Sequence, residues 1–109
     1  MMIDADKIAA ALSKLGKSWA EADAQSRYLD ELRPVVKATL MMGRLEAGDS
    51  VSKAEVYAVG NSAYVKHLEA IKAAKQNANE AWAAWETAKI KAELLRSNAS
   101  TERALAQIR

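Results

Sequence analysis

Apolar residues recur every seven positions through the second half of the chain, and this repeat restricts the possible folds more than any other feature. The first recurring position holds Tyr57, Tyr64, Ile71, Ala78, Trp85, Ala92 and Ala99, and Leu68 and Trp82 fall on a second recurring position. Such a repeat is typical of helices that pack as coiled coils. We therefore expect one long helix here, with an oligomerisation seam made of Tyr57, Tyr64, Leu68, Ile71, Trp82 and Trp85.

The second recurring position also holds polar residues, namely Asn61, Lys75, Lys89, Arg96 and Arg103. A uniform zipper would not tolerate them, so the long helix is expected to pack on other helices of its own chain as well. One Pro and four Gly leave few turns, and strands need β-branched and aromatic runs between turns. The sequence predicts an all-α fold in one domain, residues 1–109, as a helical bundle or coiled-coil-like oligomer.

Two further helices are expected before the long one. A short N-terminal helix begins at Asp4, whose carboxylate can cap free N–H groups, and ends at Gly16. A second helix begins at a capping box that starts at Ser18. It runs to Ala47, before Gly48 and Asp49. Pro34 lies inside this stretch, which predicts a kink, or two helices that meet near 32–34.

The long helix is expected to begin at a second capping box, from Ser52 to Glu55, and to continue through Arg96. The pair Gly60 and Asn61 is its only weak point. Residues 101–108 either continue the helix or lie outside it.

The core of this chain is expected to be thin. Alanine accounts for 24 of the 109 residues and there is no Phe, so much of the apolar content buries little area. Small chains already bury a low fraction of their surface. We therefore expect a homo-oligomer.

Several classes of function lack support in the sequence. The chain has no Cys, which excludes disulfides and thiolate metal sites, and it has no long apolar run that could cross a membrane. Its single histidine, His67, has no catalytic partner, and Glu86 and Glu93 lie too far apart along a helix to share a metal. We expect no enzymatic activity, no metal, no cofactor and a cytoplasmic location.

The charges are unevenly distributed along the chain. Residues 1–50 carry seven basic and eight acidic side chains, a net charge of −1, and residues 51–109 carry nine and six, a net charge of +3. Cations near Trp82 and Trp85 suit single-stranded nucleic acid, in which phosphates meet Lys or Arg and bases stack on rings. The alternative is that both rings are packed in the seam and that the cations form a solvated face. The alternative is favoured for the two tryptophans.

Two stretches resemble the UvsY-like family of phage recombination mediator proteins. The first is Leu40-Met41-Met42-Gly43-Arg44-Leu45 before a Gly-containing turn, where Arg44 matches an arginine of the family and Met42 replaces its lysine. The second runs from Val51 to about Arg103, with a central Trp and a later basic Arg96-Ser97 pair. The resemblance implies a ring-like homo-oligomer that binds single-stranded DNA and helps load a recombinase onto strands coated with single-strand-binding protein, in a bacterial host cell.

These considerations define one predicted site and one alternative. The predicted DNA-binding residues are Lys37, Arg44, Lys89, Lys91 and Arg96. The resemblance selects Arg44, and the excess of basic residues selects the cations of the long helix. The alternative is a helical oligomeric adaptor that binds protein, or a phage inhibitor, with no nucleic-acid activity.

Overall fold

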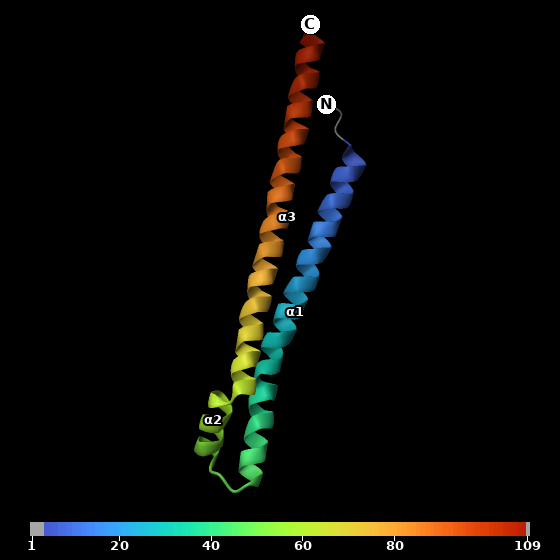
Figure 1. Ribbon diagram of the computed structural model, residues 1–109. Coiled ribbons are helices and arrows are strands. Elements are labelled where there is room, and N and C mark those ends of the chain that lie inside the picture. The colour runs from blue at the N-terminus through green and yellow to red at the C-terminus, as the bar shows by residue number, and fades with distance from the viewer. Residues whose placement is uncertain (1–3, 109) are drawn as a thin grey trace. The chain divides into compact units, whose positions relative to one another are not determined.

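The computed structural model describes residues 4–108, which form three helices and no strand (Figure 1). Helix α1 spans Ala5–Glu46, α2 spans Val51–Gly60 and α3 spans Ser62–Ile108. The predicted all-α class is confirmed. Residues 101–108 continue α3.

Helix α1 begins where the sequence predicts but does not end at Gly16. The Asp4 carboxylate accepts a hydrogen bond from the backbone N–H of Lys7 at 3.1 Å, as an N-cap does. The helix then runs without a break through Gly16 and Ser18, so the predicted short first helix and the capping box at Ser18 are wrong. A glycine inside a helix costs only about 1 kcal/mol relative to alanine. A packed helix face outweighs that cost.

Pro34 also lies inside α1, so the alternative of two helices that meet near 32–34 is wrong. The predicted kink itself stays a prediction. Proline has no N–H to donate to the carbonyl four residues back and crowds the helix there. The Leu29 carbonyl, five residues before Pro34, accepts a hydrogen bond from His67 Nε2 at 2.7 Å. His67 therefore joins α3 to α1 within two turns of the proline.

The end of α1 is confirmed at Gly48 and Asp49. Gly48 has a φ of +99°, and its N–H donates to the Leu45 carbonyl at 3.0 Å. The Asp49 N–H donates to the Arg44 carbonyl, also at 3.0 Å. These two bonds form a Schellman motif, which needs the left-handed conformation that glycine adopts without strain.

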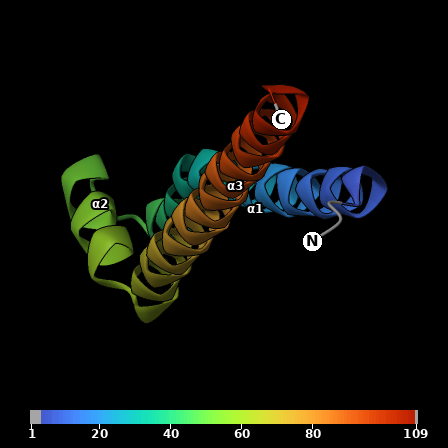
Figure 2. The same cartoon turned by 90° about the horizontal axis from the view of Figure 1, so that it is seen from above.

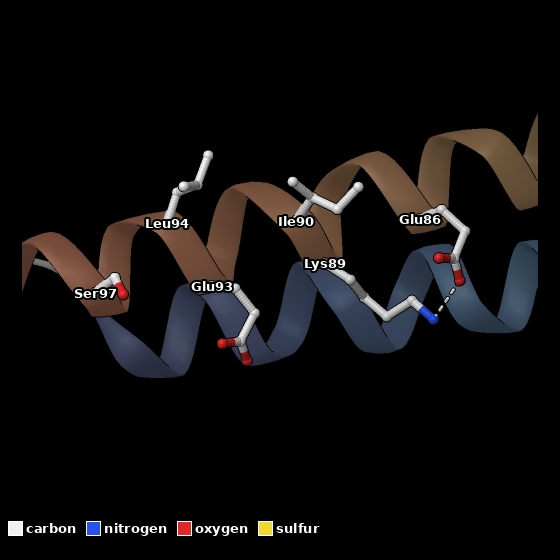
Figure 3. Close-up of a pocket in the computed structure, with 6 residues that line it drawn as sticks. All are labelled: Glu86, Lys89, Ile90, Glu93, Leu94 and Ser97. Atoms are coloured by element: carbon white, nitrogen blue, oxygen red, sulfur yellow. Dashed lines mark ion pairs between the residues drawn. The ribbon is translucent and has the colours of Figure 1, made fainter.

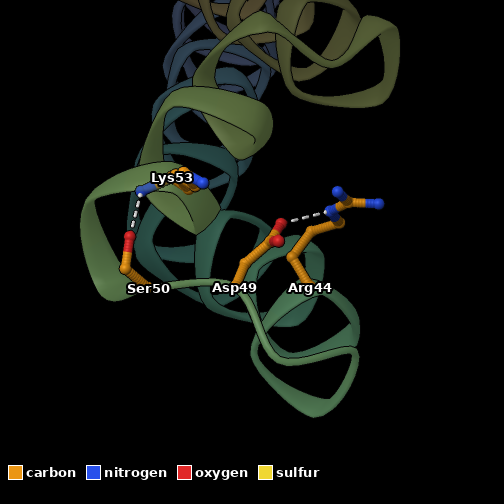
Figure 4. Close-up of polar contacts among 4 residues, drawn as sticks. All are labelled: Arg44, Asp49, Ser50 and Lys53. Atoms are coloured by element: carbon orange, nitrogen blue, oxygen red, sulfur yellow. Dashed lines mark hydrogen bonds and ion pairs between the residues drawn. The ribbon is translucent and has the colours of Figure 1, made fainter.

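Helix α2 is separate from α3, so the prediction of one helix from Ser52 through Arg96 is wrong. Its N-cap is Ser50 rather than Ser52, and the Ser50 hydroxyl accepts from the Lys53 N–H at 3.3 Å (Figure 4). Asn61 is extended, and its side-chain oxygen accepts from the Ala63 N–H at 2.9 Å. Asn61 thus starts α3 in the way that an N-cap does. The short α2 joins the end of α1 to the start of α3 (Figure 2).

The chain consists of two compact units, which we describe separately. One unit contains the described parts of 1–20 and 79–109, and the other is Glu21–Ala78. All of the buried residues among 4–108 lie in the second unit: Ser26, Ala54, Ala58, Ile71 and Ala78. None of them is larger than isoleucine, so neither unit has a core of large side chains.

The least exposed face of α3 follows the seven-residue repeat. Its members alternate in steps of three and four residues: Tyr64, His67, Ile71, Ala74 and Ala78 in the second unit, and Ala81, Trp85, Ala88 and Ala92 in the first. This face contains five residues of the first recurring position, namely Tyr64, Ile71, Ala78, Trp85 and Ala92, whereas Tyr57 lies on α2 and is exposed. Its other positions hold His67 and small alanines, and Leu68 and Trp82 of the second recurring position are exposed. Alanine allows helices to approach closely, which explains why it can replace a larger apolar residue in such a seam.

Candidate functional site

Lys37 of the predicted DNA-binding set is engaged within the second unit. Its ammonium Nζ lies 2.7 Å from Oε1 of Glu55 on α2. The hydrogen bond to Glu55 raises the pKa of Lys37 above its usual value, and the bond from Lys37 lowers the pKa of Glu55. This cation therefore joins α1 to α2, and a phosphate would have to compete with Glu55 for it.

Arg44 is held in a similar way at the end of α1. Its Nε donates to Oδ2 of Asp49 at 2.8 Å (Figure 4), and its guanidinium carbon lies 4.9 Å from the centre of the Tyr57 ring. The guanidinium is thus shared between a carboxylate and an aromatic face. Both contacts stabilise the turn between α1 and α2.

The first unit contains a group of aromatic and charged side chains around Trp85. The rings of Trp19 and Trp85 stack, with centroids 5.5 Å apart and an angle of 22° between their planes. A Cβ atom added to Gly16 would lie 3.3 Å from Cε2 of the Trp85 ring, so the glycine makes room for the indole. The Lys89 ammonium lies 4.0 Å from the centre of the same ring and also pairs with Glu86. Lys89, the third predicted DNA contact, is therefore engaged as well.

A shallow, open hollow lies along α3 in this unit (Figure 3). It is lined by Glu86, Lys89, Ile90, Glu93, Leu94 and Ser97. Ile90 and Leu94 are well exposed, and charged side chains surround them. All of the lining comes from one helix, so the hollow is an open patch on the surface of α3 rather than an enclosed pocket for a small ligand.

Lys91 and Arg96 differ from the other predicted DNA contacts because both are exposed. Within residues 4–108, no ion pair or hydrogen bond joins either side chain to another residue. Arg96 also shares one side of α3 with Trp82, Lys89 and Arg103, because these residues recur every seven positions. Trp82 is 49% exposed. Within the single chain Trp85 packs on Trp19 and Trp82 is half exposed, so the packing of Trp82 in a seam between copies stays a prediction.

Of the six residues expected to join copies of the chain, three are exposed in the single chain and three are not. Ile71 is buried within the single chain, Tyr64 is half-buried, and Trp85 stacks on Trp19. Tyr57, Leu68 and Trp82 are exposed. The role of the six in assembly stays a prediction, and the exposed three are the members that a second molecule could cover.

The sequence reasoning missed two features. The first is the stacking of Trp85 on Trp19, a residue that directly follows the helix start predicted at Ser18. The other feature is an exposed apolar stripe on α1, where Tyr28, Val35 and Met42 are each more than half exposed. The sequence contains a signal for this stripe, because the three residues are spaced seven apart.

The charges of the two units are close to balanced. Residues 21–78 carry eight basic and eight acidic side chains, and residues 1–20 with 79–109 carry eight basic and six acidic ones, which leaves +2 for the first unit. In the second unit, residues 51–78 carry a net charge of +2 and residues 21–50 carry −2, so the basic excess is balanced there, whereas residues 1–20 add a net charge of +1 to the first unit.

Within residues 4–108, no group of three His, Asp or Glu side chains could hold a metal ion. None of the helices in that range combines the length and the apolar character that crossing a bilayer requires. A comparison of the chain with protein-family models, curated proteins and solved structures finds no match in any of the three.

Proposed function

We propose that the chain is a self-assembling helical adaptor, which completes its fold on another protein surface. The observation that supports this proposal is that large apolar side chains stay exposed on every helix of residues 4–108, while the buried side chains there are mostly alanines.

The chemistry of the exposed surface supports the same proposal. Sixteen large apolar side chains are more than a third exposed, and they occur on all three helices. Single exposed apolar residues are ordinary on a monomer, but contiguous apolar patches are characteristic of interaction sites. The buried side chains are mostly alanines, so contacts within one chain leave most of the large apolar groups in water.

Measurement of the solution mass by analytical ultracentrifugation tests this proposal. We expect a species of at least twice 11.8 kDa at micromolar concentration. A folded, helical monomer under these conditions would contradict the proposal. Circular dichroism on the same sample establishes that the chain is folded.

Binding of single-stranded DNA is the second candidate, and one observation favours it. Trp82, Arg96 and Arg103 lie on one exposed side of α3 together with Lys89, at intervals of seven residues or about 10 Å. An aromatic ring in line with cations suits a strand whose bases stack and whose phosphates pair. Loading of a recombinase onto coated strands, which the resemblance to the mediator family implies, extends this candidate.

A titration of labelled single-stranded oligonucleotide at several salt concentrations separates the two candidates. DNA binding predicts that the logarithm of affinity falls by about 0.7 per log unit of salt for each phosphate contacted. The double variant Lys91→Ala/Arg96→Ala should then weaken binding and reduce the slope. Lys53→Ala, which removes an exposed cation from α2, is the control and should have no effect. Absence of binding at low salt would refute the DNA candidate and leave the adaptor.

A further inference from the structure

Helix α1 carries an apolar stripe that nothing in its own unit covers. Tyr28, Val35 and Met42 are seven residues apart and are 56%, 56% and 58% exposed. The stripe also contains Ala24, Ala38 and Leu45, which are exposed as well. Its members alternate in steps of three and four residues over three heptads, the spacing that one helix presents to another.

This stripe lies on the opposite side of α1 from the intramolecular contacts. The less exposed residues of α1 in this unit include Ser26, Leu29 and Val36; Ser26 is buried, and the Leu29 carbonyl accepts the bond from His67 on α3. At 100° of rotation per residue, the two sets differ in mean direction by about 180°. Lys37, which holds α2, points to a third side. α1 therefore has one face that contacts its own unit and, on the opposite side, an apolar face that is exposed.

We infer that the stripe from Ala24 to Leu45 binds a second copy of this chain, helix against helix in antiparallel orientation. This inference rests on the proposed self-assembly and assigns a surface to it. Three large apolar side chains that are each more than half exposed give the surface that such a pair would bury. The unit that carries the stripe has eight basic and eight acidic side chains, so two copies approach without net repulsion and no strongly charged partner is favoured.

The orientation follows from Glu31, the one carboxylate within the stripe. In a parallel pair in register, Glu31 would face Glu31 of the partner subunit, and like charges at such close positions destabilise a helix pair. In an antiparallel pair, Tyr28 lies against Ala38 of the partner subunit and Met42 lies against Ala24 of the partner subunit. Large side chains then meet small ones, and the two carboxylates are separated.

The first experiment measures mass for two matched variants. Val35→Glu places a charge in the stripe, and Ile90→Glu places the same charge at an equally exposed apolar site on α3, outside it. We expect Val35→Glu to halve the mass of the dimer while the helical signal is retained, and Ile90→Glu to leave the mass unchanged. If Ile90→Glu dissociated the assembly and Val35→Glu did not, the stripe would not be the interface, although the proposed self-assembly would still hold. A monomeric parent chain would refute both.

The second experiment tests the orientation with single cysteines, which are the only thiols because the chain has none. Ala24→Cys carrying a size tag is mixed with untagged Met42→Cys, and the mixture is oxidised. We expect the cross-linked product of intermediate size, which contains one of each chain. Met42→Cys alone should cross-link poorly, since its two thiols lie about 27 Å apart in the antiparallel pair. Rapid cross-linking of Met42→Cys to itself, without the mixed product, would overturn the antiparallel arrangement.

Discussion

Gly16 and Gly43 offer a direct test of how tightly α1 packs against the Trp85 indole. Both glycines lie inside α1, and each can be replaced by alanine. A Cβ at position 43 meets nothing within 4 Å. Gly43→Ala should therefore show the helix-propensity gain alone, about 0.5 to 1 kcal/mol in the free energy of unfolding. For a chain of this size that gain corresponds to a rise of about 2 to 8 °C in Tm.

At Gly16 the same gain is opposed by a steric contact. The new Cβ would lie 3.3 to 3.4 Å from three atoms of the Trp85 ring, so the ring must shift by a few tenths of an ångström. The ring cannot shift freely, because Trp19 stacks on it and the Lys89 ammonium contacts it. Overpacking of this kind costs about 1 to 3 kcal/mol. Gly16→Ala should therefore leave the free energy of unfolding unchanged or lower it by up to about 2 kcal/mol.

Denaturant unfolding, followed by circular dichroism at one fixed protein concentration, measures both variants. The fixed concentration matters because self-association contributes to apparent stability. In a Trp85→Leu background the steric contact is removed, and Gly16→Ala should then stabilise as Gly43→Ala does. Equal stabilisation by the two substitutions in the native background would show that no indole packs on Gly16, and the reasoning would fail.

Three further predictions follow from single contacts. Pro34→Ala should stabilise the chain by about 1 to 3 kcal/mol in denaturant unfolding, because it restores a helical N–H and removes the clash inside α1. A destabilised variant would show that the proline is needed. Trp85→Ala should cost about 3 kcal/mol, whereas Trp82→Ala, at a half-exposed site, should change the stability of a dissociated chain by no more than about 0.5 kcal/mol. Equal losses would contradict the distinction between the two rings. The Lys37–Glu55 pair should stabilise the fold at neutral pH, lose that contribution as pH falls through the lowered pKa of Glu55, and also lose it as pH rises through the raised pKa of Lys37. The parent chain should have a larger free energy of unfolding than Glu55→Gln at neutral pH, and this difference should disappear at low pH and at high pH. A difference that does not change with pH would contradict this account.

The fold class could be predicted from the sequence because the restriction is local. Few glycines, one proline and a seven-residue repeat suit helices and little else. The Asp4 cap and the end of α1 at Gly48 were predictable for the same reason, since a capping carboxylate and a left-handed glycine act within a few residues. Local chemistry alone determines these features.

Gly16 and Ser18 were interpreted wrongly because their roles depend on distant residues. A glycine followed by a Ser-x-x-Glu pattern matches a helix end and a new start, yet the helix continues. The glycine instead gives the Trp85 indole room on the face of α1, a role that no local pattern reveals. The break at Asn61 was underestimated, since a weak point in a helix becomes a turn only when the segments on both sides pack separately.

The candidate cations show the same dependence. Counting charges predicts where basic residues are numerous but not which of them are already paired. Lys37 pairs with Glu55 across the turn that joins α1 and α2, and Arg44 pairs with Asp49 within that turn. Only Lys91 and Arg96 of the predicted set are exposed without an ion pair to another residue in 4–108. A charge count therefore overestimates the basic surface available to a nucleic acid.

The contrast between Trp82 and Trp85 links the fold to both proposed functions. Three residues turn a helix by about 300°, so the two side chains point about 60° apart. The edge of the α3 seam passes between them: Trp85 stacks on Trp19, and Trp82 remains half exposed. A large ring at the edge of a seam gains most of its stabilisation only when a further molecule covers it. A second protein surface and a stacked base could each provide that cover, and they would affect Trp82 differently. Protein assembly would protect its fluorescence from a soluble quencher at all salt concentrations, whereas DNA would protect it only at low salt.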